Sequence, residues 1–157
     1  MAIEVRRAMN AGEFGTFRAL AAEYEASLPQ DLKHADFAAQ CADVATHFSP
    51  PHAAFVARDA GVPAGCVAVT VDAVSRVAVV KKLYVVPALR KRGIARLLMN
   101  ALIAYARESG ITRLVLDTAR ERMQPAYALY LALGFRDCAP YGEVDYRCPT
   151  FMDLAIG

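Results

Sequence analysis

The chain has 157 residues, of which 56% are hydrophobic and 22% are charged, and its formal net charge is +2. This balance excludes a disordered chain and favours one domain, residues 1–157, that is large enough for a sizeable core. The small net charge argues against a general nucleic-acid binder, and neither a membrane-length apolar run nor an apolar leader is present, so we expect no partnership with nucleic acid or membrane.

The N-terminal part predicts a strand followed by two helices. Residues Ile3–Ala8 alternate between apolar and polar, which is typical of a half-buried strand. Asn10 is a good N-cap, with a glutamate three positions later as capping-box partner, and helical spacing then continues to about Ser27. A second, weaker helix is predicted from Asp36 up to the Ser-Pro-Pro break at residues 49–51.

The middle of the chain predicts a hairpin and then a third strand. Ala53–Arg58 and Gly65–Val71 are strand-like, and the turn sequence DAGVP joins them. The run Val77–Val86 follows, rich in β-branched and aromatic residues and interrupted only by Lys81 and Lys82. A proline directly after this run marks the end of the strand.

A basic turn containing a glycine then opens a helix. Gly93 can adopt positive φ and lets a ligand approach the backbone, and the helix Ile94–Glu108 begins directly after it. The free N–H groups of a first helical turn and the helix dipole favour an anion at such a place. Four cations surround it: Arg90, Lys91, Arg92 and Arg96. We therefore predict a phosphate-binding site.

The C-terminal part predicts a strand–helix–strand crossover and two short final strands. Thr112–Thr118 is strand-like, and a helix follows from about Gln124 to Leu133, stopped by a glycine. The helix Ile94–Glu108 therefore links two strands that are expected to lie parallel. Phe135–Ala139 and Thr150–Leu154 complete the set, joined by the polar loop PYGEVDYRCP.

Two motifs in this order resemble those of the GCN5-related N-acetyltransferase (GNAT) superfamily. The segment RKRGIA at residues 90–95 resembles the family's [Q/R]-x-x-G-x-[G/A] loop, and AYALYLALGF at residues 126–135 resembles its A-x-x-L-Y-x-x-x-G-F signature. The resemblance covers nearly the whole chain. It implies an α/β (α+β) domain with the GNAT fold: a mixed central sheet of about six to seven strands with a splayed motif strand, flanked by about four helices.

The resemblance implies acetyl-CoA as the acyl donor. Its pyrophosphate would lie on the backbone from about Lys91 to Arg96, and its pantetheine arm would pair with the preceding strand like an added strand. The residues expected to bind it are Leu83, Tyr84, Val85, Arg90, Lys91, Arg92, Gly93, Ile94, Ala95, Arg96, Met123, Ala126 and Tyr130.

The implied reaction is transfer of an acetyl group to a primary amine of a small molecule or peptide, by direct attack in a ternary complex and without a metal. Tyr130 matches the family's tyrosine near the thioester sulfur, and its expected role is general acid. A phenol with a pKa of about 10 is protonated at neutral pH and can donate a proton to the departing thiolate. The alternative for Tyr130 is an ordinary core aromatic.

The identity of the general base is left open, because two positions depart from the family pattern. The acidic residue that members often carry early in the motif strand is Val79 here, and the asparagine that many carry before the tyrosine is Met123. Asp117, at the end of a strand, is the first candidate base, although it could equally be a turn residue. Behind it stand Glu23, Glu25 and Glu143. A neutral amine that needs no base is a further alternative.

The same departures favour, as a rival, a non-catalytic acyl-CoA-binding or sensory domain. For the enzyme, the resemblance implies that the acceptor is recognised by residues Glu23–His52 and Pro140–Pro149. Their acidic residues mildly favour a cationic amine: Glu23, Glu25, Asp31, Glu143 and Asp145. The identity of the amine, the length of the acyl group and a homodimer as opposed to a monomer are left open.

Cysteines and histidines do not suggest another chemistry. The four cysteines, Cys41, Cys66, Cys138 and Cys148, are far apart and form no CxxC pair, so we expect reduced thiols and a cytoplasmic location. His47 and His52 flank a helix-breaking segment and lack a third ligand nearby, so we expect no metal site.

Overall fold

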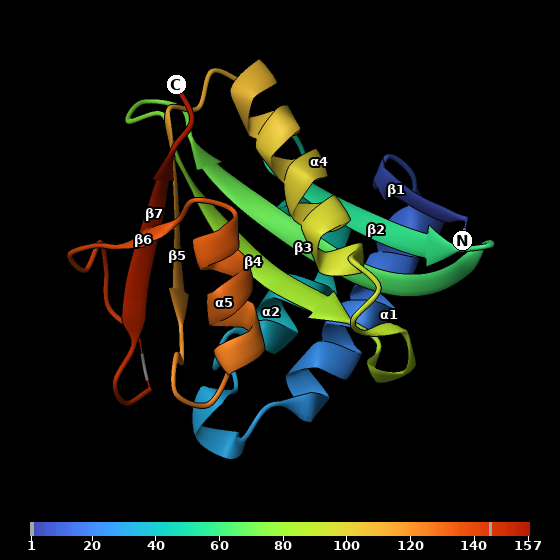
Figure 1. Ribbon diagram of the computed structural model, residues 1–157. Helices are drawn as coiled ribbons and strands as arrows, with labels where there is room; N and C mark the ends of the chain where they lie inside the picture. Colours follow the sequence, from blue (N-terminus) through green and yellow to red (C-terminus); the bar gives the residue numbers. More distant parts are fainter. Residues whose placement is uncertain (1, 145) are drawn as a thin grey trace.

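A computed structural model describes residues 2–144 and 146–157 of the chain. Within them, a mixed sheet of seven strands is covered by helices on both faces (Figure 1). The strands are β1 (Ile3–Arg7), β2 (Ala53–Asp59), β3 (Val62–Asp72), β4 (Val77–Val85), β5 (Arg113–Thr118), β6 (Arg136–Asp137) and β7 (Thr150–Ala155). The helices are α1 (Ala11–Ser27), α2 (Phe37–Ala42), α3 (Val44–His47), α4 (Ile94–Glu108) and α5 (Gln124–Ala132), with 3₁₀ turns at Gln30–Leu32 and Pro87–Leu89.

The strands lie in the order β1-β2-β3-β4-β5-β7-β6. Neighbours are antiparallel except β4 and β5, which are parallel and are joined through α4. The predicted strand–helix–strand crossover is therefore confirmed, and so are the mixed sheet and the α/β (α+β) fold class. In Figure 1, α4 and α5 lie in front of the sheet, and α1 and α2 lie behind it.

Helix α1 begins as its cap residues predict. The Asn10 side chain accepts a hydrogen bond from the Glu13 N–H at 2.9 Å. The Glu13 carboxylate in turn accepts one from the Met9 N–H at 3.0 Å, one residue earlier than in a standard capping box. Two of the N–H groups at this helix start are thus satisfied by side chains.

The prediction of one continuous second helix is wrong. Asp43, with φ −142° and ψ 72°, interrupts it and separates α2 from α3. The Asp43 carboxylate accepts a hydrogen bond from the Thr46 N–H at 3.3 Å, so it caps a new helix. This break is why five helices stand where about four were expected.

Two boundaries between strands also differ from the prediction. The β2–β3 turn contains only Ala60 and Gly61, both at positive φ, because the Val62–Pro63 pair already belongs to β3. Near the C-terminus, the strand expected over Phe135–Ala139 shrinks to β6, whose pairing with β7 covers two residues.

Strands β4 and β5 separate partway along their length. They pair only from Val77 opposite Arg113 to Val79 opposite Val115. Beyond this point the β4 edge that faces β5 has no strand partner among the described residues, which is the splayed strand that the resemblance implied. A bulge at Lys82, whose φ is 58°, also shifts the β3–β4 register.

Each face of the sheet has its own hydrophobic core. Leu98 and Leu102 of α4 are fully buried on one face, and Phe17 and Leu20 of α1 are buried on the other. The two cores hold the helices against opposite faces, so the gap between β4 and β5 can be reached by residues from both sides.

Candidate active site

A cavity of about 560 Å³ lies where β4 and β5 separate. Its walls come from β4 residues 79–83, from residues 116–119 at the end of β5, and from α5. The end of α1 (Tyr24 and Leu28), the segment before α2 with Gln40 of α2, and the loop before β7 complete it. Of the residues expected at the site, those that line the cavity are Leu83, Asp117, Met123, Ala126 and Tyr130.

Tyr130 stands in the cavity wall on α5 and is only 8% exposed. Its ring packs against Phe135, with 5.8 Å between the ring centroids. Burial raises the pKa of the Tyr130 phenol well above its ordinary value, and the negative fields of Tyr24 and Asp117 add to the effect. The hydroxyl is therefore protonated at neutral pH and can act as a proton donor.

Asp117 is held by two tyrosines from the loop before β7. Its Oδ1 accepts a hydrogen bond from the Tyr141 hydroxyl at 3.1 Å, and its Oδ2 accepts one from the Tyr146 hydroxyl at 2.6 Å. Burial, together with the bond to this carboxylate and its charge, raises the pKa of both tyrosines. The result is a fixed carboxylate in the cavity wall, with lone pairs left for a further donor.

The basic loop meets the physical requirements of an anion site. Gly93 is the N-cap of α4 at φ 79°, and nothing lies within 4 Å of the position that a Cβ would occupy. No side chain caps the helix, and no backbone carbonyl of the described residues accepts from the N–H groups of Ile94, Ala95 and Arg96. A phosphate group fits this open, donor-rich helix start.

The four cations expected around the loop divide into two pairs. The Arg90 Nε donates to the Val85 carbonyl at 3.0 Å, and its guanidinium lies 5.8 Å from the centroid of the Tyr84 ring. Arg92 lies 3.7 Å from a carboxylate oxygen of Asp59. In the described part of the chain, the exposed side chains of Lys91 and Arg96 have no ion-pair partner. Arg90 and Arg92 therefore already support the loop itself.

The three β4 residues expected to bind the pantetheine arm point their side chains to different faces of the sheet. Leu83 and Val85 pack against the core on the α4 face, whereas Tyr84 belongs to the core on the α1 face, with its ring centroid 5.9 Å from that of Tyr24. Their backbone lies on the β4 edge that faces the gap. Of the three, Leu83 alone lines the cavity, and the other two continue along the strand towards the basic loop.

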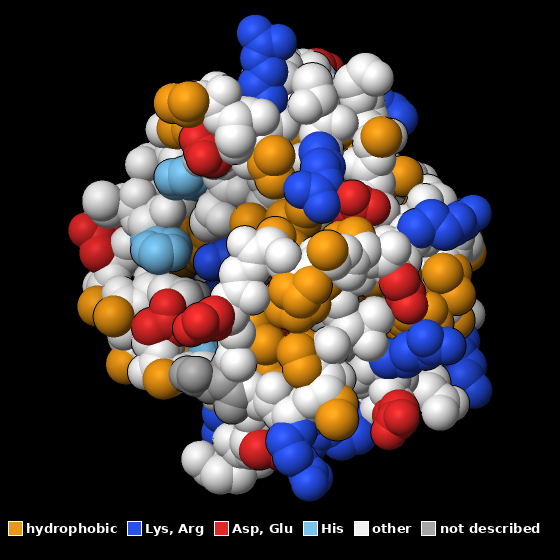
Figure 2. All heavy atoms as spheres, turned by 90° about the vertical axis from the view of Figure 1, so that its left-hand side faces the viewer, with side chains coloured by type: hydrophobic (Ala, Val, Ile, Leu, Met, Phe, Trp, Pro, Cys, Tyr) orange, Lys and Arg blue, Asp and Glu red, His pale blue; other side chains and the backbone are white. Residues whose placement is uncertain are grey.

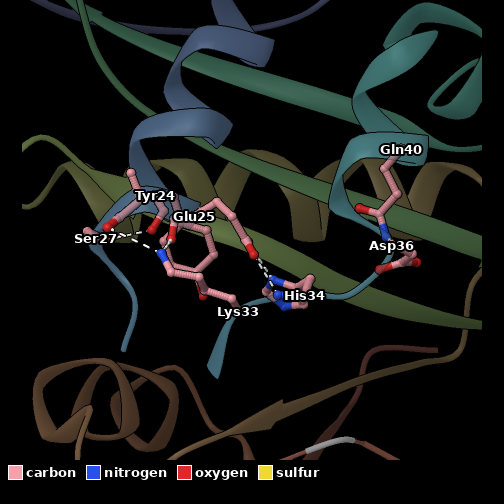
Figure 3. A network of polar contacts seen from close by, with 8 residues as sticks. Tyr24, Glu25, Ser27, Lys33, His34, Asp36 and Gln40 are labelled. Carbon is pink, nitrogen blue, oxygen red and sulfur yellow. Dashed lines mark hydrogen bonds and ion pairs between the residues drawn. The ribbon is translucent and has the colours of Figure 1, made fainter. Parts of the chain in front are cut away.

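A carboxylate–imidazole pair reaches the cavity from the α1 side (Figure 3). Glu25 is 7% exposed, and its Oε2 lies 2.7 Å from Nδ1 of His34. Its Oε1 accepts a hydrogen bond from the His34 backbone N–H. His34 lines the cavity. Sequence reasoning named Glu25 only as a reserve carboxylate and missed His34, because no periodicity links residues nine positions apart across a turn.

Lys82 is a second cavity residue that was not expected at the site. The bulge in β4 turns it toward α2, where its Nζ lies 5.1 Å from the centroid of the Phe37 ring. The residue is 6% exposed, and burial lowers the pKa of its amine. In the sequence it looked like an interruption of an apolar strand.

The other acidic residues expected near the acceptor are scattered. Glu143 lines the cavity, whereas Glu23 is exposed and lies outside its wall. Asp31 is paired with Arg122 at 2.6 Å, and this hydrogen bond lowers the pKa of the Asp31 carboxyl. Asp145 lies outside the described residues.

Two further observations concern metals and membranes. Over residues 2–144 and 146–157, no three or more His, Cys, Asp or Glu side chains are grouped as a metal would require, and the expected absence of a metal stays a prediction. The described helices include none with the length and apolar character needed to cross a membrane.

Comparison with known proteins identifies the family of this chain. The model of the acetyltransferase (GNAT) family matches residues 17–135. An IAA acetyltransferase from Azospirillum brasilense is 33% identical over 100 residues, which are 64% of this chain; the chain spans 65% of that relative's length.

Solved structures share the fold at low sequence identity. An acetyltransferase of the GNAT family from Staphylococcus aureus matches with a TM-score of 0.80 and 16% identity, over 99% of this chain and 100% of that one. A protein from Salmonella typhimurium, solved with its cofactor acetyl-CoA, matches with a TM-score of 0.75 and 21% identity, over 100% of this chain and 95% of that one. From the family match over most of its length, the chain belongs to the acetyltransferase (GNAT) family.

Proposed function

We propose that the protein is an acetyl-CoA-dependent N-acetyltransferase that acetylates a primary amine of a small molecule or peptide by direct attack in a ternary complex. The observation that carries this proposal is the joint placement of a buried, protonated Tyr130 and a fixed carboxylate in one cavity between the splayed strands. Family membership supports acyl transfer, and the Salmonella protein with acetyl-CoA supports the choice of donor.

The donor would extend along β4 from the basic loop to the cavity. The open start of α4 would receive the pyrophosphate, with Lys91 and Arg96 supplying charge and Arg90 and Arg92 holding the loop in shape. The unpaired β4 edge at Leu83–Val85 would pair with the amides of the pantetheine arm. Met123, Ala126 and Tyr130 of the cavity wall would surround its thioester end.

Two residues receive catalytic roles. Acetyl-CoA supplies the acetyl group as an activated thioester. Tyr130 donates the proton that the departing thiolate needs, since its pKa favours the protonated phenol. Asp117 accepts a hydrogen bond from the acceptor's ammonium group and orients it, because the two tyrosine bonds fix the carboxylate but leave lone pairs free. The role of Asp117 as the general base stays a prediction.

We also propose a cytoplasmic location, with no part for nucleic acid or membrane. Figure 2 supports the first of these exclusions for the face that it shows, where Lys and Arg side chains are interspersed with Asp and Glu. A nucleic-acid surface would instead gather cations along a track.

The test is a screen of small amines, amino acids, polyamines and peptide N-termini, each mixed with acetyl-CoA and the protein and read by release of free thiol. We expect release with at least one class, at rates that fall when Tyr130 is replaced by Phe. Binding of acetyl-CoA without thiol release from any amine would overturn the proposal and favour the non-catalytic acyl-CoA-binding domain. That rival is motivated by Val79, which leaves this part of β4 without a carboxylate.

A further inference from the structure

We propose that His34, in place of Asp117, is the general base of the reaction and that Glu25 is its positioning residue. In this role, Nε2 of His34 removes a proton from the acceptor's ammonium group, and the Glu25 carboxylate fixes the tautomer and orientation of the ring. This inference rests on the proposed function, because it names the proton acceptor for the same amine transfer.

The first support is the geometry of the pair. The Glu25 carboxylate accepts from the His34 backbone N–H with one oxygen and contacts Nδ1 of the ring, at 2.7 Å, with the other. The backbone of Glu25 is also fixed, because Nζ of Lys33 donates a hydrogen bond to the Glu25 carbonyl at 2.8 Å (Figure 3). Backbone and ring of His34 are therefore both fixed by one buried side chain.

The second support is the tautomer that this geometry selects. A neutral imidazole carries one N–H, and a carboxylate can only accept, so the proton lies on Nδ1. The lone pair is then on Nε2, for which the described part of the chain offers no hydrogen-bond partner. This is the arrangement of a general base: an imidazole oriented by a carboxylate, with the second nitrogen free for substrate.

The third support is the position of the ring relative to the proposed acid. His34 lines the same cavity as Tyr130, but it approaches from the α1 side of the sheet, whereas Tyr130 belongs to α5 on the α4 side. The centroid of the His34 ring lies 6.3 Å from that of Tyr24, which in turn packs beside Tyr84 of β4. Base and acid are thus supplied by separate elements that line one cavity from opposite sides of the sheet.

The proton balance closes with these two groups. Nε2 takes one proton from the ammonium, the neutral amine nitrogen forms a bond to the acetyl carbon as the carbon–sulfur bond breaks, and the Tyr130 hydroxyl gives its proton to sulfur. The nitrogen, now positively charged, releases its second proton to water, and water reprotonates the Tyr130 phenolate, so the products are the amide, the free thiol and one proton on His34. The His34 side chain is 43% exposed, so the imidazolium can return its proton to water. The other charged groups of the cavity wall are Asp31, Lys33, Asp36, Lys81, Lys82, Asp117 and Glu143.

The test compares His34→Gln and Glu25→Gln with the matched control His47→Gln, which changes an exposed histidine outside the cavity wall. We expect His34→Gln to lower kcat by about 10²–10⁴-fold with acetyl-CoA affinity unchanged, and to abolish the acidic limb of the kcat/KM profile. Glu25→Gln should lower kcat because an amide can donate to Nδ1 and stabilise the wrong tautomer. The control should behave like the parent protein.

A second variant separates catalysis from a purely structural role of the pair. His34→Ala should recover activity when free imidazole is added, whereas a loop that has only lost its anchor should not respond. An unchanged acidic limb in His34→Gln, or no imidazole rescue of a folded His34→Ala, overturns the inference while the parent's activity leaves the proposed function standing. A parent protein that acetylates no amine overturns both.

Discussion

Gly65 provides a test of how closely β3 supports β4. It is buried in β3 opposite Val85, and a Cβ at this position would lie 2.6 Å from the Tyr84 carbonyl oxygen, 3.2 Å from a Leu98 methyl and 3.4 Å from the Val85 Cα. The first contact is with backbone and cannot be relieved by rotating a side chain. The substitution Gly65→Ala must therefore push β4 outward at the edge proposed to hold the pantetheine arm.

Overpacking of this kind costs about 1–3 kcal/mol of unfolding free energy. For a chain of this length each kcal/mol shifts Tm by roughly 2–4 °C, so we expect Gly65→Ala to lower Tm by roughly 2–12 °C. The matched control is Gly15→Ala, in the exposed part of α1, where nothing lies within 4 Å of the added methyl group. Because alanine is the better helix former, the control should gain about 0.5–1 kcal/mol.

The assays are thermal unfolding by circular dichroism and acetyl-CoA binding by calorimetry. We expect opposite signs of the Tm shift for the two variants and weaker acetyl-CoA binding for Gly65→Ala alone. A Gly65→Ala protein as stable as the parent would refute the steric reasoning. A less stable variant with the parent's affinity would refute the assignment of this β4 edge to the donor.

Three further predictions follow from the site. Tyr130→Phe should lower kcat by about 10²-fold or more without changing acetyl-CoA affinity, and full activity would remove Tyr130 from the mechanism. Gly93→Asp should abolish acetyl-CoA binding in calorimetry, because it adds a strained left-handed residue and a negative charge where the phosphates are proposed to lie; unaltered affinity would count against the loop. Burial, with the charges of Asp117 and Glu25, raises the pKa of Tyr24 to about 12 from 10.0, so the folded state holds this proton more tightly. The stabilisation from this bound proton is complete below about pH 10 and is lost as the pH rises through about 12. Urea unfolding at pH 9 and at pH 11 should therefore show a smaller decrease in unfolding free energy between the two pH values for Tyr24→Phe than for the parent.

Residue types that start or stop a helix explain which element boundaries could be predicted from the sequence. The helix Ile94–Glu108 was predicted at both ends, since a glycine stands just before it and Ser109-Gly110 just after it. The break between α2 and α3 at Asp43 could not be predicted, because neither glycine nor proline marks it and the local apolar spacing continues through it. Sequence patterns identify ends that a residue type enforces, and they miss ends that depend on one side chain capping its own backbone.

The residues of the candidate site likewise include some that the sequence could predict and some that depend on the three-dimensional fold. Asp117 and Tyr130 line one cavity from consecutive elements, the last strand of the crossover (β5) and the helix after it (α5), whose order the sequence predicts. The pairing of Glu25 with His34 depends instead on how the chain folds back after α1, through the 3₁₀ turn at Gln30–Leu32. Likewise, the partners of Arg90 and Arg92 come from three-dimensional neighbours, so sequence could count the cations but could not divide them between loop and ligand.

The two phenols that hold Asp117 set a rule for protein engineering. A designer who grafts a different loop between β6 and β7 to change the proposed acceptor would remove both donors unless tyrosines are rebuilt at positions 141 and 146. Such a graft would leave a partly buried carboxylate short of its partners, which destabilises the fold and frees Asp117 to turn away from the cavity. Libraries that diversify this loop should therefore keep these two tyrosines constant and vary the residues between them.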